Sequence, residues 1–156
     1  MRIQLENFGM RILAIDVGER ELRVARAVRA FGAVRLGAVE RIAFADRAEL
    51  AGALAQLAAS RPQAVLTALP AALVTHRFVT LPFRDRRRLA ATVPLELLGH
   101  LPAAPEDPVI AFAPLARTQA GTVVLAAVAR RTDVDAYLEP FVAAGLAPAR
   151  LDLAPL

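Results

Sequence analysis

The chain has 156 residues, of which 56% are hydrophobic and only 5% are aromatic, and its formal net charge is +4. This composition excludes a disordered chain and indicates a core built from Ala, Leu and Val. The absence of cysteine excludes disulfides and thiolate metal sites, and the modest, dispersed positive charge gives no indication of nucleic-acid binding.

Neither a membrane span nor a resident cofactor is expected from this sequence. No apolar run approaches the ~20 residues that cross a bilayer. The longest run, over residues 64–74, is interrupted by Thr67 and Pro70. The two histidines, His76 and His100, have no carboxylate at a spacing typical of a zinc site. We therefore expect neither a metal centre nor a transmembrane segment in this chain.

The first part of the chain predicts three strands, a helix and a fourth strand. Residues 11–17 form an apolar strand that a turn at Gly18 joins to a second strand, and residues 33–44 alternate as a third. Asp46 is placed to cap the following helix, with Glu49 three residues later in the capping-box position. Residues 64–69 then form a short strand of the kind that lies parallel to a first one after a crossover helix. The predicted order is β-β-β-α-β.

The remainder predicts a different order, β-α-β-β-α-β, which is the split βαβ pattern of a ferredoxin-like fold. Asp85 and Thr132 are placed to cap its two helices, and Gly145 to end the second. Its strands are expected at residues 74–81, 109–116, 122–129 and from 150 onward. The core is expected to include Phe78, Phe83, Phe112 and Phe141.

Short motifs follow one another in a characteristic order along residues 11–156. They are Ile15-Asp16-Val17-Gly18, Leu69-Pro70, Arg77-Phe78-Val79-Thr80-Leu81-Pro82, Val124-Leu125-Ala126-Ala127-Val128-Ala129-Arg130, Ala144-Gly145-Leu146-Ala147-Pro148 and Leu151-Asp152. Their order and spacing resemble the type IV pilus assembly protein M and the cytoplasmic part of the type II secretion protein L, within the actin-like ATPase fold.

The resemblance implies an α/β (α+β) chain that forms the first lobe of the actin-like, or ribonuclease H-like, fold. On this basis residues 10–72 form the actin-like subdomain. Residues 73–156 form a ferredoxin-like subdomain and end where a second lobe would begin. The chain is therefore interpreted as a first-lobe fragment.

The resemblance also implies a function without catalysis. Such a chain is a cytoplasmic scaffold at the bacterial inner membrane. It binds the secretion or pilus assembly ATPase and small single-pass inner-membrane proteins of the same machine. The choice between the secretion and pilus systems stays open, as does a homodimeric state. No cofactor and no nucleic-acid partner are expected.

Asp16 and Gly18 resemble the first phosphate-binding loop of the actin-like fold, in which the acid orients a metal-bound water. Here the loop is degenerate, because Glu19 and Glu21 would oppose a bound phosphate and no hydroxyl residue follows Gly18. The alternative is a plain hairpin turn whose aspartate accepts local backbone N–H bonds. Asp16 and Gly18 stay candidates for a weak nucleotide contact, and we expect no hydrolysis by this chain.

The densest run of charge consists of Arg84, Arg86, Arg87 and Arg88 around Asp85. The simplest interpretation is the solvated first turn of a helix. Positive charge at a helix N-terminus opposes the macrodipole, however. The run is therefore also a candidate surface for an acidic partner or for anionic lipid headgroups.

Two further hypotheses belong to other functional classes. One is an actin-like ATP-binding protein whose nucleotide site is completed by a missing second lobe. The other is a regulatory ferredoxin-like domain that binds small ligands. This last hypothesis predicts that the β-β-β-α-β segment does not pack as the first half of an actin-like lobe.

Overall fold

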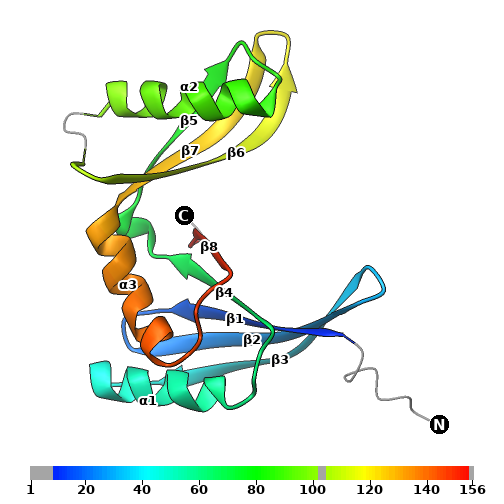
Figure 1. The fold of residues 1–156 in the computed structure, drawn as a ribbon, viewed down its shortest axis with the longest axis vertical. Helices are drawn as coiled ribbons and strands as arrows, with labels where there is room; N and C mark the ends of the chain where they lie inside the picture. Colours follow the sequence, from blue (N-terminus) through cyan, green and yellow to red (C-terminus); the bar gives the residue numbers. More distant parts are fainter. Residues whose placement is uncertain (1–8, 102–104, 155–156) are drawn as a thin grey trace. The chain divides into compact units, whose positions relative to one another are not determined.

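The computed structural model describes residues 9–101 and 105–154, and these divide into two compact units (Figure 1). Of the described residues, 9–70 and 136–154 form the first unit, and those between 71 and 135 form the second. Each unit has its own sheet and its own hydrophobic core.

The first unit is built on a five-stranded sheet with the order β3-β2-β1-β4-β8. Its strands are β1 (Met10–Val17), β2 (Glu21–Ala30), β3 (Ala33–Ala43), β4 (Ala64–Leu69) and β8 (Arg150–Leu153). The first three strands form an antiparallel meander, whereas β4 is parallel to β1 and β8 is parallel to β4. The predicted β-β-β-α-β order of this segment is therefore confirmed.

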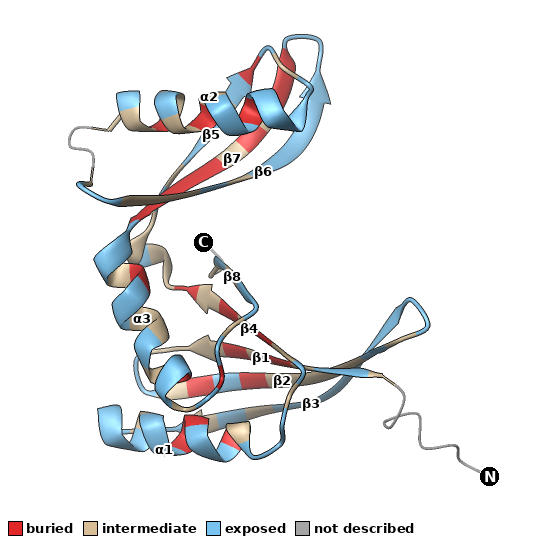
Figure 2. Ribbon diagram, in the orientation of Figure 1, coloured by how far each residue is buried: buried red, intermediate tan, exposed pale blue. Residues whose placement is uncertain are grey.

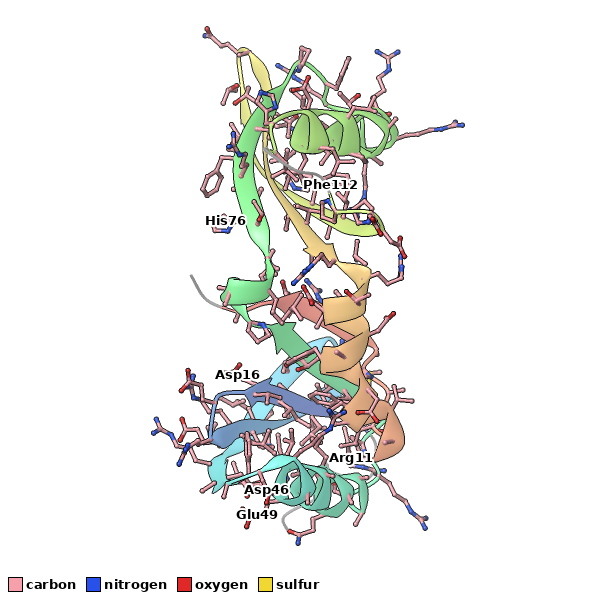
Figure 3. The ribbon with its side chains drawn as sticks, turned by 90° about the vertical axis from the view of Figure 1, so that its left-hand side faces the viewer. Arg11, Asp16, Asp46, Glu49, His76 and Phe112 are labelled. Atoms are coloured by element: carbon pink, nitrogen blue, oxygen red, sulfur yellow. The ribbon has the colours of Figure 1, made fainter. Side chains whose placement is uncertain are left out.

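Two helices bury one face of this sheet, α1 (Arg47–Ala58) and α3 (Arg131–Ala143) (Figures 1 and 2). The fully buried core side chains come from both strands and helices: Leu13, Ile15, Leu22, Val24, Leu54 and Phe141. The capping box at α1 is confirmed, because the Asp46 carboxylate accepts the Glu49 N–H and the Glu49 carboxylate accepts the Ala45 N–H (Figure 3). Arg47 on α1 also pairs with Glu139 on α3.

The second unit has a three-stranded antiparallel sheet with the order β5-β7-β6 and one covering helix. After a short 3₁₀ turn, η2 (Ala71–Leu73), its elements are β5 (Thr75–Leu81), α2 (Arg86–Gly99), β6 (Pro108–Thr118) and β7 (Gly121–Arg130). Leu89, Val93 and Leu97 project from α2 onto the sheet, where Val124 is one of the buried contacts. Asp85 caps α2 as predicted, by accepting the Arg88 N–H at 3.0 Å.

The ferredoxin-like prediction for the last helix and strand is wrong. Within the described residues, β8 pairs with β4 of the first sheet and not with the second sheet, which has three strands and one helix. The physical cause is burial: Phe141 and Leu146, on and just after α3, are completely covered in the core of the first unit. The predicted segment 73–156 is consequently divided, with residues from 136 onward returning to the first unit.

The ends of α3 agree only in part with the sequence analysis. Gly145 ends the helix as expected, with a φ of 75°, while the Leu146 N–H donates to the Phe141 carbonyl at 2.8 Å. The helix begins at Arg131, directly after β7, and not after a cap at Thr132. The Arg131 N–H is instead satisfied by the Asp107 carbonyl at 3.0 Å.

The phenylalanines that were expected in the core are found there, with one exception. Phe141 is completely buried and Phe83 and Phe112 pack against the second core, but Phe78 on β5 is 66% exposed and is not a core residue. None of the helices within residues 9–101 and 105–154 combines the length and the hydrophobicity needed to traverse a bilayer.

Candidate functional site

The turn after β1 contains both residues that were predicted to contact a nucleotide. Asp16 is the penultimate residue of β1, and Gly18 begins the turn to β2 (Figure 3). The Gly18 N–H donates to the Glu21 carbonyl at 2.9 Å and closes the turn. A Cβ at Gly18 would lie 3.2 Å from that carbonyl oxygen. The N–H group that could have bound a phosphate is therefore already used within the hairpin.

The Asp16 carboxylate is occupied by an arginine on the neighbouring strand. Asp16 and Arg23 are directly paired in the β1–β2 register, and Arg23 Nη1 lies 3.1 Å from Asp16 Oδ2. The same guanidinium donates from Nε to Glu21 Oε1 at 2.9 Å. The hydrogen bond from Arg23 lowers the pKa of Glu21, and the two acids raise the pKa of Arg23. One guanidinium thus pairs with two carboxylates at this turn, and the three groups together keep one net negative charge.

Beside this turn lies a polar pair that sequence reasoning missed, Thr67 and Tyr137. The Tyr137 hydroxyl donates to the Ala68 carbonyl at 2.8 Å and lies 2.7 Å from Thr67 Oγ1. Burial raises the pKa of Tyr137, an effect that the hydrogen bond to Thr67 partly offsets. The available signal was a threonine inside the apolar strand β4 and the single tyrosine of the chain.

Asp16, Thr67 and Tyr137 share one location, the carboxyl ends of the parallel strands β1 and β4. Thr67 pairs with Ile15 in the register, one residue before Asp16, and the Asp16 charge contributes to the raised pKa of Tyr137. Ligands of α/β proteins bind at this edge of a parallel sheet. Asp16 is the group here that could orient a metal-bound water. The part of the chain that the structure describes contains no cluster of three or more potential metal ligands. Nucleotide contact by Asp16 and Gly18 stays a prediction.

The second candidate site is the basic cluster Arg84, Arg86, Arg87 and Arg88 at the start of α2. All four side chains are exposed, and none lies within ion-pair distance of a carboxylate in residues 9–101 and 105–154. Asp85, between them in sequence, uses its carboxylate to cap the helix. The four guanidinium groups are therefore exposed to solvent, and no carboxylate among the described residues forms an ion pair with them.

A shallow depression of about 260 Å³ adjoins this basic cluster. Its lining includes Arg84, Arg86 and a fifth arginine, Arg117 of β6, together with Leu89 and Leu115. Leu115 is 54% exposed because β6 has an irregularity between Pro114 and Ala116 that leaves it unpaired. A lining of apolar and cationic side chains is suited to a segment that carries both apolar and acidic side chains.

The loop that holds the basic cluster is tied to the neighbouring strand. Thr122 Oγ1 on β7 donates to the Phe83 carbonyl at 2.6 Å. Gly121 has a φ of 137°, and a Cβ there would lie only 1.9 Å from the Leu81 carbonyl oxygen. Only glycine allows this approach of the two backbones. The position of Arg84 and the helix start is thus fixed from the β6–β7 turn.

Comparison with known proteins gives a likeness in structure. No protein-family model and no curated protein matches the sequence. The cytoplasmic domain of EpsL, an inner membrane component of the type II secretion system of Vibrio cholerae, matches with a TM-score of 0.58 and 19% identity, over 91% of this chain. This chain spans 57% of the length of that domain. A Bacteroides thetaiotaomicron protein with an actin-like ATPase fold and unknown function matches with a TM-score of 0.45 and 9% identity, over 97% of this chain and 55% of that protein.

The EpsL comparison confirms the predicted α/β fold class, apart from the ferredoxin-like arrangement that the strand order corrects. The chain has the α/β fold of the cytoplasmic domain of EpsL, and the resemblance to the type II secretion protein L is confirmed at the level of the fold.

Proposed function

We propose that this chain, which has the fold of the EpsL cytoplasmic domain, is a non-catalytic scaffold of a bacterial type II secretion or type IV pilus assembly machine. The observation that carries the proposal is the shared fold over 91% of the chain. In this role it lies on the cytoplasmic side of the inner membrane, where it connects an assembly ATPase to single-pass inner-membrane proteins. The Arg23 pairing at the Asp16 turn supports a role without catalysis.

The basic cluster is the surface that we propose for the ATPase. Its four guanidinium groups lack carboxylate partners among the described residues, and the adjacent depression offers Leu89 and Leu115 as apolar contacts. Arginine is enriched at protein interfaces because it combines a planar donor set with an apolar stem. We expect the ATPase to present an acidic segment with one or two apolar side chains to this surface.

Charge reversal of the basic cluster tests the docking surface. Replacing Arg86, Arg87 and Arg88 by Glu should weaken binding to the ATPase at least about tenfold, because three attractive contacts become repulsive. Binding is measured by pull-down and by surface plasmon resonance with the ATPase of the same organism. The helix should persist, because Asp85 still caps it and glutamate near a helix N-terminus is favourable.

A matched control distinguishes the effect of the basic cluster from the effect of the changed net charge. Replacing the exposed Arg20, Arg41 and Arg61 of the first unit by Glu makes the same change in formal charge, three times two units, from +4 to −2. This control should bind the ATPase normally. Equal loss in both triple variants would show a general charge effect, and unchanged binding in the Arg86–Arg88 variant would remove the basic cluster from the proposal.

A second candidate function is ATP binding that is completed by a further lobe. Asp16, Thr67 and Tyr137 at the carboxyl ends of β1 and β4 favour it, because this edge is where parallel sheets bind ligands. Isothermal titration calorimetry of the full-length protein with Mg-ATP is the test. Saturable binding that Asp16→Ala abolishes would favour a nucleotide-binding protein, whereas the scaffold proposal expects no heat of binding.

A further inference from the structure

The hairpin of β2 and β3 has an exposed aromatic tip. Phe31 and Gly32 are its two turn residues, both with positive φ, 51° and 78°, which is the left-handed turn that suits a two-residue hairpin. Glycine or asparagine normally occupies such positions, and a bulky side chain is disfavoured there. Phe31 is nevertheless present and is 88% exposed. The positive φ of Phe31 is therefore unfavourable, and packing of the ring within the first unit does not offset it.

The apolar surface continues from the tip along β3. Val34 and Leu36 are 63% and 64% exposed, and they alternate with Arg35, so both lie on the same face of the hairpin. Met10 of β1 adjoins them through Arg29, which pairs with Met10 on one side and with Val34 on the other. An aromatic tip is therefore presented together with the aliphatic side chains of Val34 and Leu36, and Arg29 lies between these and Met10.

The charges around this tip have one sign. The ten residues Ala27–Leu36 include Arg29 and Arg35 and no acid. Arg29 shares a face with Val34, to which it is paired, and Arg35 is the next residue, so the two arginines project to opposite faces. Neither has a carboxylate within ion-pair distance in residues 9–101 and 105–154. Glu40, which lies further along β3, forms an ion pair with Arg26 at 2.7 Å.

We propose that the β2–β3 tip inserts into the surface of an anionic lipid bilayer. A phenyl ring at the water–hydrocarbon boundary gains burial without a preformed pocket, and arginines on both faces can contact headgroups on either side of the tip. A protein groove would be contacted mainly through one face, and the arginine on the other face would have no partner. The charge on both faces therefore favours a planar anionic surface. This inference is independent of the proposed ATPase contact, which uses the second unit.

Tryptophan at the tip gives a local test. The chain contains no tryptophan, so the emission of Phe31→Trp reports this one position. With vesicles of phosphatidylcholine and phosphatidylglycerol the emission should shift to the blue and be quenched by brominated acyl chains. Phosphatidylcholine vesicles alone should leave it unchanged. No shift with anionic vesicles would overturn the proposal, and so would an equal shift with neutral ones. A blue shift without lipid that grows with protein concentration would assign the tip to a second copy of the chain and also overturn it.

Co-sedimentation of the full chain with the same vesicles measures binding, and matched variants show which residues it depends on. Phe31→Gly suits the positive φ and should keep or raise thermal stability, yet it should weaken vesicle binding about tenfold or more. Arg29→Gln and Arg35→Gln should each weaken it about fivefold. Phe78→Ala removes another strongly exposed phenyl ring, one that lies in the second unit, and should leave vesicle binding unchanged. Normal binding by Phe31→Gly would overturn the proposal.

The two proposed surfaces can be tested separately. When Phe31→Trp is combined with glutamate at Arg86, Arg87 and Arg88, the blue shift with anionic vesicles should persist, because the tip belongs to the first unit and the basic cluster to the second. Failure of the ATPase proposal and failure of the lipid proposal are therefore distinguishable. Loss of the blue shift in the combined variant would assign the lipid contact to the basic cluster and overturn the role of the tip.

Discussion

Tyr137 is the residue whose ionisation should be visible in the stability of the whole chain. The sequence contains this one tyrosine, no cysteine and no lysine. Between about pH 10 and pH 11.5, therefore, it is the only side chain with an ordinary pKa in range. Burial raises its pKa in the folded protein, where its hydroxyl donates to Ala68 and contacts Thr67.

We predict that the free energy of unfolding falls above pH 10 through Tyr137 alone. The raised pKa means that the unfolded chain loses its tyrosine proton first. The stabilisation is therefore fully present below the unfolded pKa and is lost as the pH rises through the folded one. Tyr137→Phe should cost about 1 kcal/mol at pH 7 by removing the hydrogen bonds, and it should abolish the alkaline decline. Urea unfolding at a series of pH values measures both effects. A decline of the same size in Tyr137→Phe would contradict the assignment.

At the scale of single elements, the residues that cap and end the helices were predictable from the sequence, whereas the pairing of strands distant in sequence was not. The caps Asp46 and Asp85 and the helix end at Gly145 are correct because each depends on neighbours within five residues. Strand β8 was assigned to the wrong sheet, because its short sequence is compatible with either. The pairing of β8 with the first sheet follows from the burial of Phe141 and Leu146 in the first core, because this burial places the residues after α3 beside that sheet.

In the candidate sites, too, contacts between residues close in sequence were predictable and contacts between distant residues were not. The degenerate character of the Asp16 turn was predictable from its acidic neighbours, and the pairing with Arg23, only seven residues away, follows from the hairpin register. Thr67 and Tyr137 are 70 residues apart, and the whole of the second unit lies between them in sequence, so no local pattern joins them. The exposure of Phe31 was also not predicted, since alternation along β3 indicates which residues share a face but not whether that face is covered.

For the whole molecule, the two separate cores imply that damage to one unit can be confined to it. The described core around Leu13 and Ile15 takes its helical contribution from α1 and α3, including Phe141, whereas the other core consists of residues between Val79 and Val128. The helix that carries Phe141 was predicted to belong to the ferredoxin-like segment. The structure instead makes Phe141 a central residue of the first unit, and this correction can be tested in solution.

Phe141→Ala should cost about 3–5 kcal/mol, and Leu97→Ala, a matched truncation of another fully buried side chain, about 2–5 kcal/mol. Hydrogen exchange followed by mass spectrometry then reports where each loss falls. Phe141→Ala should reduce protection in β1 and β4 and leave α2 and β7 protected, because its ring contacts the first core. Leu97→Ala should have the opposite effect, because α2 covers the second sheet. Loss of protection in β5–β7 on Phe141→Ala, with β1 and β4 unchanged, would instead return α3 to the second unit and restore the ferredoxin-like arrangement.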